Sequence, residues 1–126
     1  MYALHSWLRY AVFLAGLAAL GYALWGMVGK RPYQKRMWDL AAAFTFTLYV
    51  QVVLGFLLIF TYRFFSGTLG LHMVFTMVAA ALAQLTYSAN RRRPREERSY
   101  GIHVFGVGLA MALVIAGILV IRNSLF

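Results

Sequence analysis

Apolar side chains occupy four long runs of the chain, separated by short polar segments. The runs cover about residues 3–28, 38–60, 69–89 and 100–121. Each run approaches or exceeds the ~20 residues that an α-helix needs to cross ~30 Å of hydrocarbon. Because the connecting segments are short, consecutive helices must run antiparallel. The pattern predicts an all-α fold: an up-down-up-down bundle of four transmembrane helices, forming a single integral membrane domain over residues 1–126.

The composition agrees with a membrane environment. Hydrophobic residues make up 63% of the 126 residues and charged residues only 12%, whereas soluble domains carry about 25% charged residues. The two prolines, Pro32 and Pro94, fall in connecting segments and interrupt no span. The chain has no cysteine, which excludes disulfides, thiolate metal sites and covalent attachment of a c-type haem.

The basic residues are concentrated in two of the connecting segments. The formal net charge is +9, and nine of the twelve Lys and Arg residues lie in KRPYQKR (30–36) and RRRPREER (91–98). Cytoplasmic loops carry such an excess, so we expect both segments in the cytoplasm and both termini outside, in a bacterial inner (plasma) membrane. Basic loops beside lipid headgroups account for the charge without nucleic acid. The expected partners are the lipid bilayer and other membrane protein subunits.

Polar side chains inside the spans are the candidates for a site, because they are costly in hydrocarbon. The sequence places the following groups in or at the edges of the spans: His5, Arg9, Asp39, Gln51, His72, Gln84, His103 and Arg122. It contains no paired carboxylates, no glycine-rich phosphate loop and no HExxH pattern, so we expect no catalytic residues of those kinds. The histidines therefore carry most of the candidate chemistry.

Two of the histidines are expected at the same depth. His5 and His72 each lie a few residues inside the outer end of the first and third helices. These helices run parallel, and a rise of ~1.5 Å per residue then brings both imidazoles to one level. The first and third helices of a square bundle are diagonal partners, so a planar macrocycle fits between them. Two imidazoles on opposite faces are a suitable axial pair for a b-type haem. The metal ligands predicted for the haem iron are His5 and His72.

Other residues are expected to assist this site or to stand apart from it. Arg9 lies one turn below His5, and Arg63 lies at the outer end of the second helix; either cation is placed to neutralise the haem propionates. His103 lies at the cytoplasmic face and is a candidate for a quinone headgroup or a second site. Glycines that would let a helix approach a flat cofactor closely are Gly16, Gly55, Gly70, Gly106 and Gly108.

Several short stretches resemble a family of small four-helix bacterial membrane proteins labelled cytochrome b-like. The stretches are LHSWLRY, GKRPYQK, YVQVVLGFLLIF and the LHM that opens the third run. The resemblance covers most of the chain and implies haem b and electron transfer, with His5 and His72 as the corresponding histidines. The chain departs from the family pattern at Tyr49 and Met73, where the family has histidine and proline.

Each candidate also has a simpler interpretation. A histidine at a helix boundary often only forms a hydrogen bond at the interface, and Arg9 can extend toward lipid headgroups. Gln51 and Gln84 suit hydrogen bonds between helices, and Met73 is an alternative axial ligand.

The sequence leaves two hypotheses for the function of the protein. The first is a membrane b-type cytochrome, an electron carrier or subunit of a redox complex rather than an enzyme. It would exchange electrons with a quinone or another partner. The alternative is a cofactor-free accessory subunit that packs against a larger membrane complex.

Overall fold

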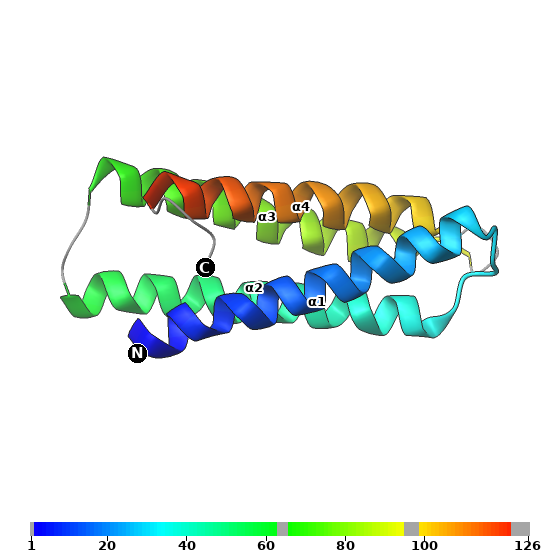
Figure 1. Cartoon of the computed structure of the whole chain (residues 1–126), viewed down its shortest axis with the longest axis horizontal. Coiled ribbons are helices and arrows are strands. Elements are labelled where there is room, and N and C mark those ends of the chain that lie inside the picture. Colours follow the sequence, from blue (N-terminus) through cyan, green and yellow to red (C-terminus); the bar gives the residue numbers. More distant parts are fainter. Residues whose placement is uncertain (1, 63–65, 95–98, 122–126) are drawn as a thin grey trace.

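The computed structural model describes residues 2–62, 66–94 and 99–121, and within them the chain forms four helices (Figure 1). The helices are α1 (Tyr2–Val28), α2 (Lys35–Tyr62), α3 (Gly67–Arg92) and α4 (Tyr100–Ile121). All four are long and apolar enough to cross a membrane. The predicted all-α four-helix fold is confirmed.

The helices extend beyond the apolar runs that predict them. The bounds of α4 agree with the prediction, whereas α2 begins at Lys35 rather than at residue 38, and α3 continues to Arg92 rather than ending at residue 89. The difference has a physical reason. An apolar run marks only the part of a helix that contacts hydrocarbon. The hydrogen bonds of the helix backbone continue beyond it, into the polar headgroup region.

Local hydrogen bonds fix where the helices begin and end. The backbone N–H of Leu69 donates to Oγ of Ser66 (3.2 Å), and that of Ile102 donates to Oγ of Ser99 (3.4 Å). Both serines therefore cap a helix N-terminus, where backbone donors lack partners within the helix. At the end of α1 the chain turns at Lys30, whose φ of 50° lies in the left-handed region. These caps define the short connections that make neighbouring helices antiparallel.

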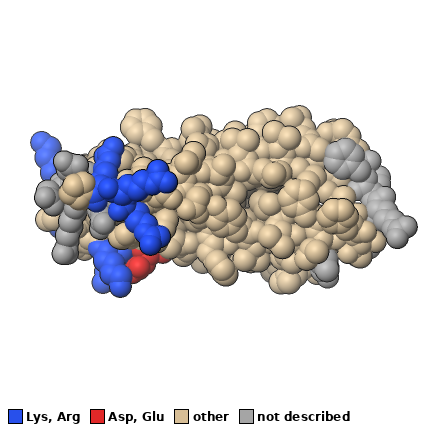
Figure 2. Space-filling view, turned by 180° about the vertical axis from the view of Figure 1, so that it is seen from behind, with Lys and Arg blue, Asp and Glu red and all other residues tan. Residues whose placement is uncertain are grey.

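The four helices form a square in which α1 and α3 lie on a diagonal. The α1 helix packs against α2 and α4, and α3 packs against the same two helices. The start of α1, the end of α2 and the start of α3 share one end of the bundle, where the α1–α2 pair diverges from the α3–α4 pair (Figure 1). We call this the histidine end, because it carries His5 and His72. The described Lys and Arg residues other than Arg9 gather at the other, basic end (Figure 2).

Small residues allow two close helix contacts. At Gly106 of α4, an added Cβ would overlap the side chain of Thr86 of α3 and lie 2.6 Å from its Cβ. At Gly26 of α1, an added Cβ would lie 2.6 Å from the ring of Tyr100. In hydrocarbon, van der Waals packing of this kind takes over part of the role that the hydrophobic effect has in water. The α3–α4 contact therefore depends on Gly106.

This dependence predicts the effect of a single methyl group. Gly106→Ala should lower the unfolding temperature of the protein in detergent, because overpacking costs about 1–3 kcal/mol and outweighs the gain in helix propensity. Gly21→Ala is the matched control, since an added Cβ at Gly21 meets nothing within 4 Å. Circular dichroism during heating measures both variants. Equal unfolding temperatures for the two variants would show that the Gly106 contact does not limit the packing.

Candidate functional site

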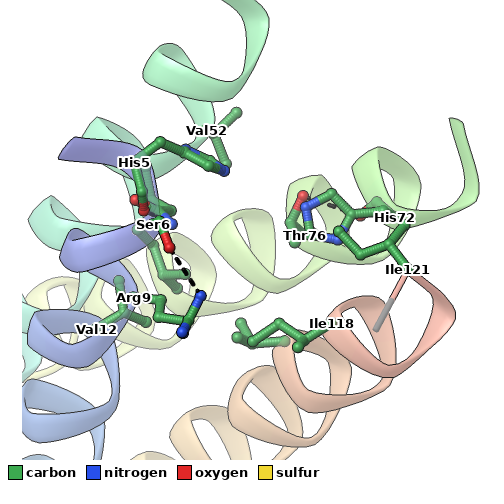
Figure 3. A pocket seen from close by; sticks show the side chains of 12 residues that line it. His5, Ser6, Arg9, Val12, Val52, His72, Thr76, Ile118 and Ile121 are labelled. Carbon is green, nitrogen blue, oxygen red and sulfur yellow. Dashed lines mark hydrogen bonds between the residues drawn. The ribbon is translucent and has the colours of Figure 1, made fainter. Parts of the chain in front are cut away.

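A cavity at the histidine end is lined by side chains of all four helices (Figure 3). Its volume is about 110 Å³. Polar lining residues come from α1, α2 and α3, and α4 contributes only apolar side chains. The lining comprises His5, Ser6, Arg9, Val12, Leu48, Gln51, Val52, His72, Thr76, Val114, Ile118 and Ile121. The cavity thus combines an apolar wall with a small set of polar groups, which is typical of cofactor sites.

A larger cavity of about 490 Å³ adjoins the first one toward the end of the bundle. It shares His5, His72 and Ile121 with the first cavity, and α2, α3 and α4 supply most of the remaining wall. In Figure 3, His5 on α1 and His72 on α3 extend from opposite sides toward the same space. The two histidines therefore lie where the cavities meet, on the two diagonal helices.

The imidazole of His72 is held by a backbone carbonyl of the neighbouring helix. Its Nδ1 lies 2.7 Å from the carbonyl oxygen of Gly117 on α4. A carbonyl oxygen only accepts, so Nδ1 must carry the hydrogen, and Nε2 keeps its lone pair. An added Cβ at Gly117 would lie 3.1 Å from Cβ of Phe75, so the glycine lets α4 approach α3 closely. A hydrogen bond from Nδ1 to a carbonyl is the usual way in which proteins orient a metal-binding histidine.

The imidazole of His5 is positioned by α2. An added Cβ at Gly55 would lie 3.3 Å from Cε1 of His5, so the ring packs directly over this glycine. The backbone of the same turn is held as well, because Nε2 of Gln51 donates to the carbonyl oxygen of His5 (2.8 Å). Gln51 thus forms a hydrogen bond between helices, as expected, and it links α2 to the first turn of α1.

Arg9 lines the inner cavity and stays close to its own helix. Its guanidinium donates to Oγ of Ser6 and to the hydroxyl of Tyr10, each at 3.0 Å, and lies 4.8 Å from the centre of the Tyr10 ring. Within residues 2–62, 66–94 and 99–121 it forms no salt bridge. The only acidic residue in those ranges is Asp39, near the start of α2 at the basic end. The cavity therefore contains a cation without a counter-ion from the described part of the chain.

Three polar atoms of the inner cavity have no hydrogen-bond partner among the described residues. They are Nδ1 of His5, Nε of Arg9 and Oε1 of Gln51, and all three are buried. Native proteins leave few buried polar atoms unsatisfied, because each one costs about 1–3 kcal/mol. The three residues that carry these atoms all line the inner cavity.

The other predicted residues lie outside the inner cavity or outside the described part of the chain. His103 lies at the basic end, fully buried, with Nε2 2.7 Å from the hydroxyl oxygen of Tyr33. Tyr49 donates to Oε1 of Gln84 (3.0 Å), which links α2 to α3 away from the cavity. Met73 lines the larger cavity, and Arg63 falls outside the described residues.

The glycines expected to face a cofactor divide in the same way. Gly55 contacts the ring of His5 and lines the larger cavity. At Gly16 an added Cβ would lie 2.7 Å from Sδ of Met111, and at Gly106 it would overlap Thr86, so both serve helix packing. Gly117 was not among the expected glycines. The sequence cannot predict the role of its carbonyl group, because every residue has a backbone carbonyl. Which one faces His72 depends on the rotation of α4 about its axis.

Comparisons with known proteins identify no relative. No protein-family model matches the chain, and neither the curated proteins nor the solved structures contain a match. The function must therefore be argued from the site itself.

The hydrogen bond to Gly117 predicts the tautomer of His72. In micelles at roughly pH 8, where a histidine is neutral, the hydrogen of His72 should reside on Nδ1. Long-range ¹H–¹⁵N correlation spectra of ¹⁵N-histidine-labelled protein distinguish the two ring nitrogens, and His72→Gln assigns the signal. A hydrogen on Nε2 of His72 would contradict the hydrogen bond to Gly117, because the lone pair of Nδ1 would then face the carbonyl oxygen.

Proposed function

We propose that the protein is a membrane electron-transfer protein of the b-type cytochrome class, with haem b bound between α1 and α3. His5 and His72 would hold the iron of the haem. The observation that carries the proposal is the pair of imidazoles on diagonal helices that line one cavity, one of them oriented by the Gly117 carbonyl. Haem, when bound, supplies single-electron exchange at its iron.

The set of donor atoms suits haem better than a metal ion bound by protein alone. The described residues contain no group of three or more His, Cys, Asp or Glu side chains that could hold a metal ion. Structural and catalytic zinc sites need three or four protein ligands. The iron of haem already has four porphyrin nitrogens, so two imidazoles complete its coordination. The larger cavity, about 490 Å³, lies within the ~300–1,000 Å³ range of ligand pockets.

The residues around the cavity have separable roles in this proposal. His72 offers Nε2 to the iron because Gly117 binds its other nitrogen, and Gln51 fixes the turn that carries His5. Arg9 provides a positive charge for a propionate, which would also satisfy its unpaired Nε. We expect the same of Arg63. A nearby cation favours the reduced iron, because reduction lowers the positive charge of the centre.

A quinone is proposed as an electron partner rather than as a ligand of His103. The imidazole of His103 is fully buried, is bonded to Tyr33 and stacks on its ring, with ring centroids 5.7 Å apart. These contacts give His103 a role in packing the α1–α2 connection against α4. A quinone dissolves in the same bilayer and can deliver single electrons from outside the bundle.

We also propose an orientation and a membrane for the protein. The basic end faces the cytoplasm and the histidine end faces outward, in the inner membrane of a bacterium. The gathering of the described Lys and Arg residues other than Arg9 at one end supports this through the positive-inside rule (Figure 2). His5 and His72 would then hold a haem near the outer surface, within reach of a periplasmic or membrane partner.

The axial ligands can be tested by absorption spectroscopy. The protein purified with haem should show the sharp α and β bands of a six-coordinate low-spin haem when reduced. His5→Ala or His72→Ala should abolish these bands and weaken haem binding at least about tenfold, since even outer partners of metal ligands contribute 10- to 100-fold. Haem titration into the apoprotein measures the affinity.

A third histidine provides the control for this test. His103→Gln removes an imidazole at the opposite end of the bundle and should leave the bands and the haem affinity unchanged. Circular dichroism should show that each variant keeps its helices, which separates loss of a ligand from loss of the fold. A wild-type protein that binds no haem, or bands that persist in both His5→Ala and His72→Ala, would refute the cytochrome proposal. The accessory-subunit alternative would then be preferred.

The orientation can be tested with single cysteines, because the natural chain has none. Gly67→Cys lies at the histidine end, where an added Cβ meets nothing within 4 Å, and Gln34→Cys lies at the basic end. In intact cells, a membrane-impermeant maleimide should label Gly67→Cys and spare Gln34→Cys, and both should react once the cells are permeabilised. The reverse pattern would place the histidine pair on the cytoplasmic side.

A further inference from the structure

A separate cavity of about 280 Å³ lies at the basic end, between α2 and α3. Four of its lining residues come from the start of α2 and two from the end of α3: Lys35, Trp38, Asp39, Ala42, Tyr87 and Arg91. The cavity shares no residue with the two cavities at the histidine end. Nothing in the proposed cytochrome function uses it.

The cavity lies at the boundary between hydrocarbon and headgroups. The apolar span of α2 starts at Lys35, and that of α3 ends at Ala89, two residues before Arg91. Lys35 and Arg91 therefore lie at headgroup level, while Ala42 lies about two helical turns further into the span. A molecule that fills this cavity has a polar part beside the two cations and an apolar part that continues into the bilayer.

The charges of the cavity suit a group with one negative charge. Lys35 and Arg91 approach from different helices, and Asp39 is the only carboxylate of the lining. Within the described part of the chain, none of these three side chains forms a salt bridge. The net formal charge of the lining is +1, which one phosphodiester would neutralise. Arginine and lysine are also the side chains that most often bind phosphate oxygens.

Two aromatic rings complete the wall. Trp38 and Tyr87 contact each other across α2 and α3, with ring centroids 5.4 Å apart and an angle of 53° between the planes. Tryptophan and tyrosine favour the level of lipid headgroups, where one edge of the ring is in a polar environment and the rest is in an apolar one. Here they provide an apolar surface for the first carbons below a phosphate.

We propose that this cavity binds the headgroup of an anionic phospholipid. Lys35 and Arg91 hold the phosphodiester between α2 and α3, and the acyl chains continue along the apolar surface of the two helices. The cavity is suited to a lipid rather than to free phosphate because its charged rim sits above an aromatic and aliphatic wall. Basic pockets between transmembrane helices are general sites of this kind. The site does not depend on haem.

Quenching of Trp38 fluorescence by brominated lipid tests the proposal. Trp7→Phe and Trp25→Phe leave Trp38 as the only tryptophan of the chain. In phosphatidylcholine vesicles, acyl-brominated phosphatidylglycerol should half-quench Trp38 at a lower mole fraction than brominated phosphatidylcholine does. Lys35→Gln and Arg91→Gln should each weaken this preference about fivefold, the order expected for one basic residue at an anionic membrane surface.

Neighbouring arginines outside the cavity provide matched controls. Arg36→Gln and Arg92→Gln remove the same charge from the same helices, but neither residue lines the cavity. Each should change the preference less than about twofold, because neither side chain lines the cavity and salt screens its more distant attraction to the headgroup. Equal losses in all four variants would show only diffuse attraction and overturn the proposal.

Two further experiments identify the chemical class of the molecule that binds in the cavity. Inorganic phosphate should not relieve quenching by brominated phosphatidylglycerol; relief would assign the cavity to soluble phosphate and overturn the lipid proposal. Asp39→Asn should strengthen the preference for phosphatidylglycerol, because it removes a negative charge. A preference for brominated phosphatidylethanolamine that Asp39→Asn weakens would mean that the carboxylate binds an ammonium group, and the anionic lipid would then be wrong.

Discussion

Hydrocarbon offers no hydrogen-bond donor or acceptor to a polar group of the chain. The backbone meets this constraint by forming helices along the whole of each apolar run. Polar side chains meet it by pairing between helices. Gln51 of α2 donates to the backbone of α1, and Tyr49 of α2 donates to Gln84 of α3. Pairing is incomplete for Nδ1 of His5, which has no hydrogen-bond partner among the described residues, and His5 lines the inner cavity.

The two ends of the bundle differ in how side chains pack between the helices. At the basic end, the hydroxyl of Tyr100 donates to the carbonyl oxygen of Pro32, its ring packs on Gly26, and Tyr33 binds His103. These contacts fill the space between the helices with aromatic rings. At the histidine end, the helix pairs diverge (Figure 1), and the described residues form no comparable aromatic cluster between them. The cavity is thus a consequence of closing the bundle at one end only.

Much of the fold could be predicted because it follows from length and hydropathy. Four runs of spanning length predict four helices, and short connections make them antiparallel. The depth of His5 and His72 follows from the helical rise, and their diagonal placement follows from the order of the helices. The rotation of each helix about its axis could not be predicted in this way. All four helices are apolar around their whole circumference, so hydropathy does not show that Gln51 faces His5 while Tyr49 faces Gln84.

The same limit explains why Gly117 was missed. A sequence pattern can single out a histidine, but it cannot select one carbonyl among those of a neighbouring helix. The selection depends on the close approach of α4 to α3, which Gly117 permits by lacking a Cβ near Phe75. The structure therefore adds to the histidine pair an oriented imidazole at His72, a hydrogen bond from Gln51 that holds the backbone of His5, and the position of Tyr49 away from the cavity.

Charge balance connects the two proposed sites. The chain has twelve Lys and Arg residues but only three Asp and Glu residues, so it cannot neutralise its own cations. A cation at a protein surface is screened by solvent and salt, whereas one held inside the bundle is not. Arg9 lines the inner cavity, and Lys35 and Arg91 are exposed at the edge of the hydrocarbon. On the proposals made here, a propionate and a phosphodiester supply the missing negative charges. Both ligands would then stabilise the fold, because anything that binds only the native state shifts the folding equilibrium toward it.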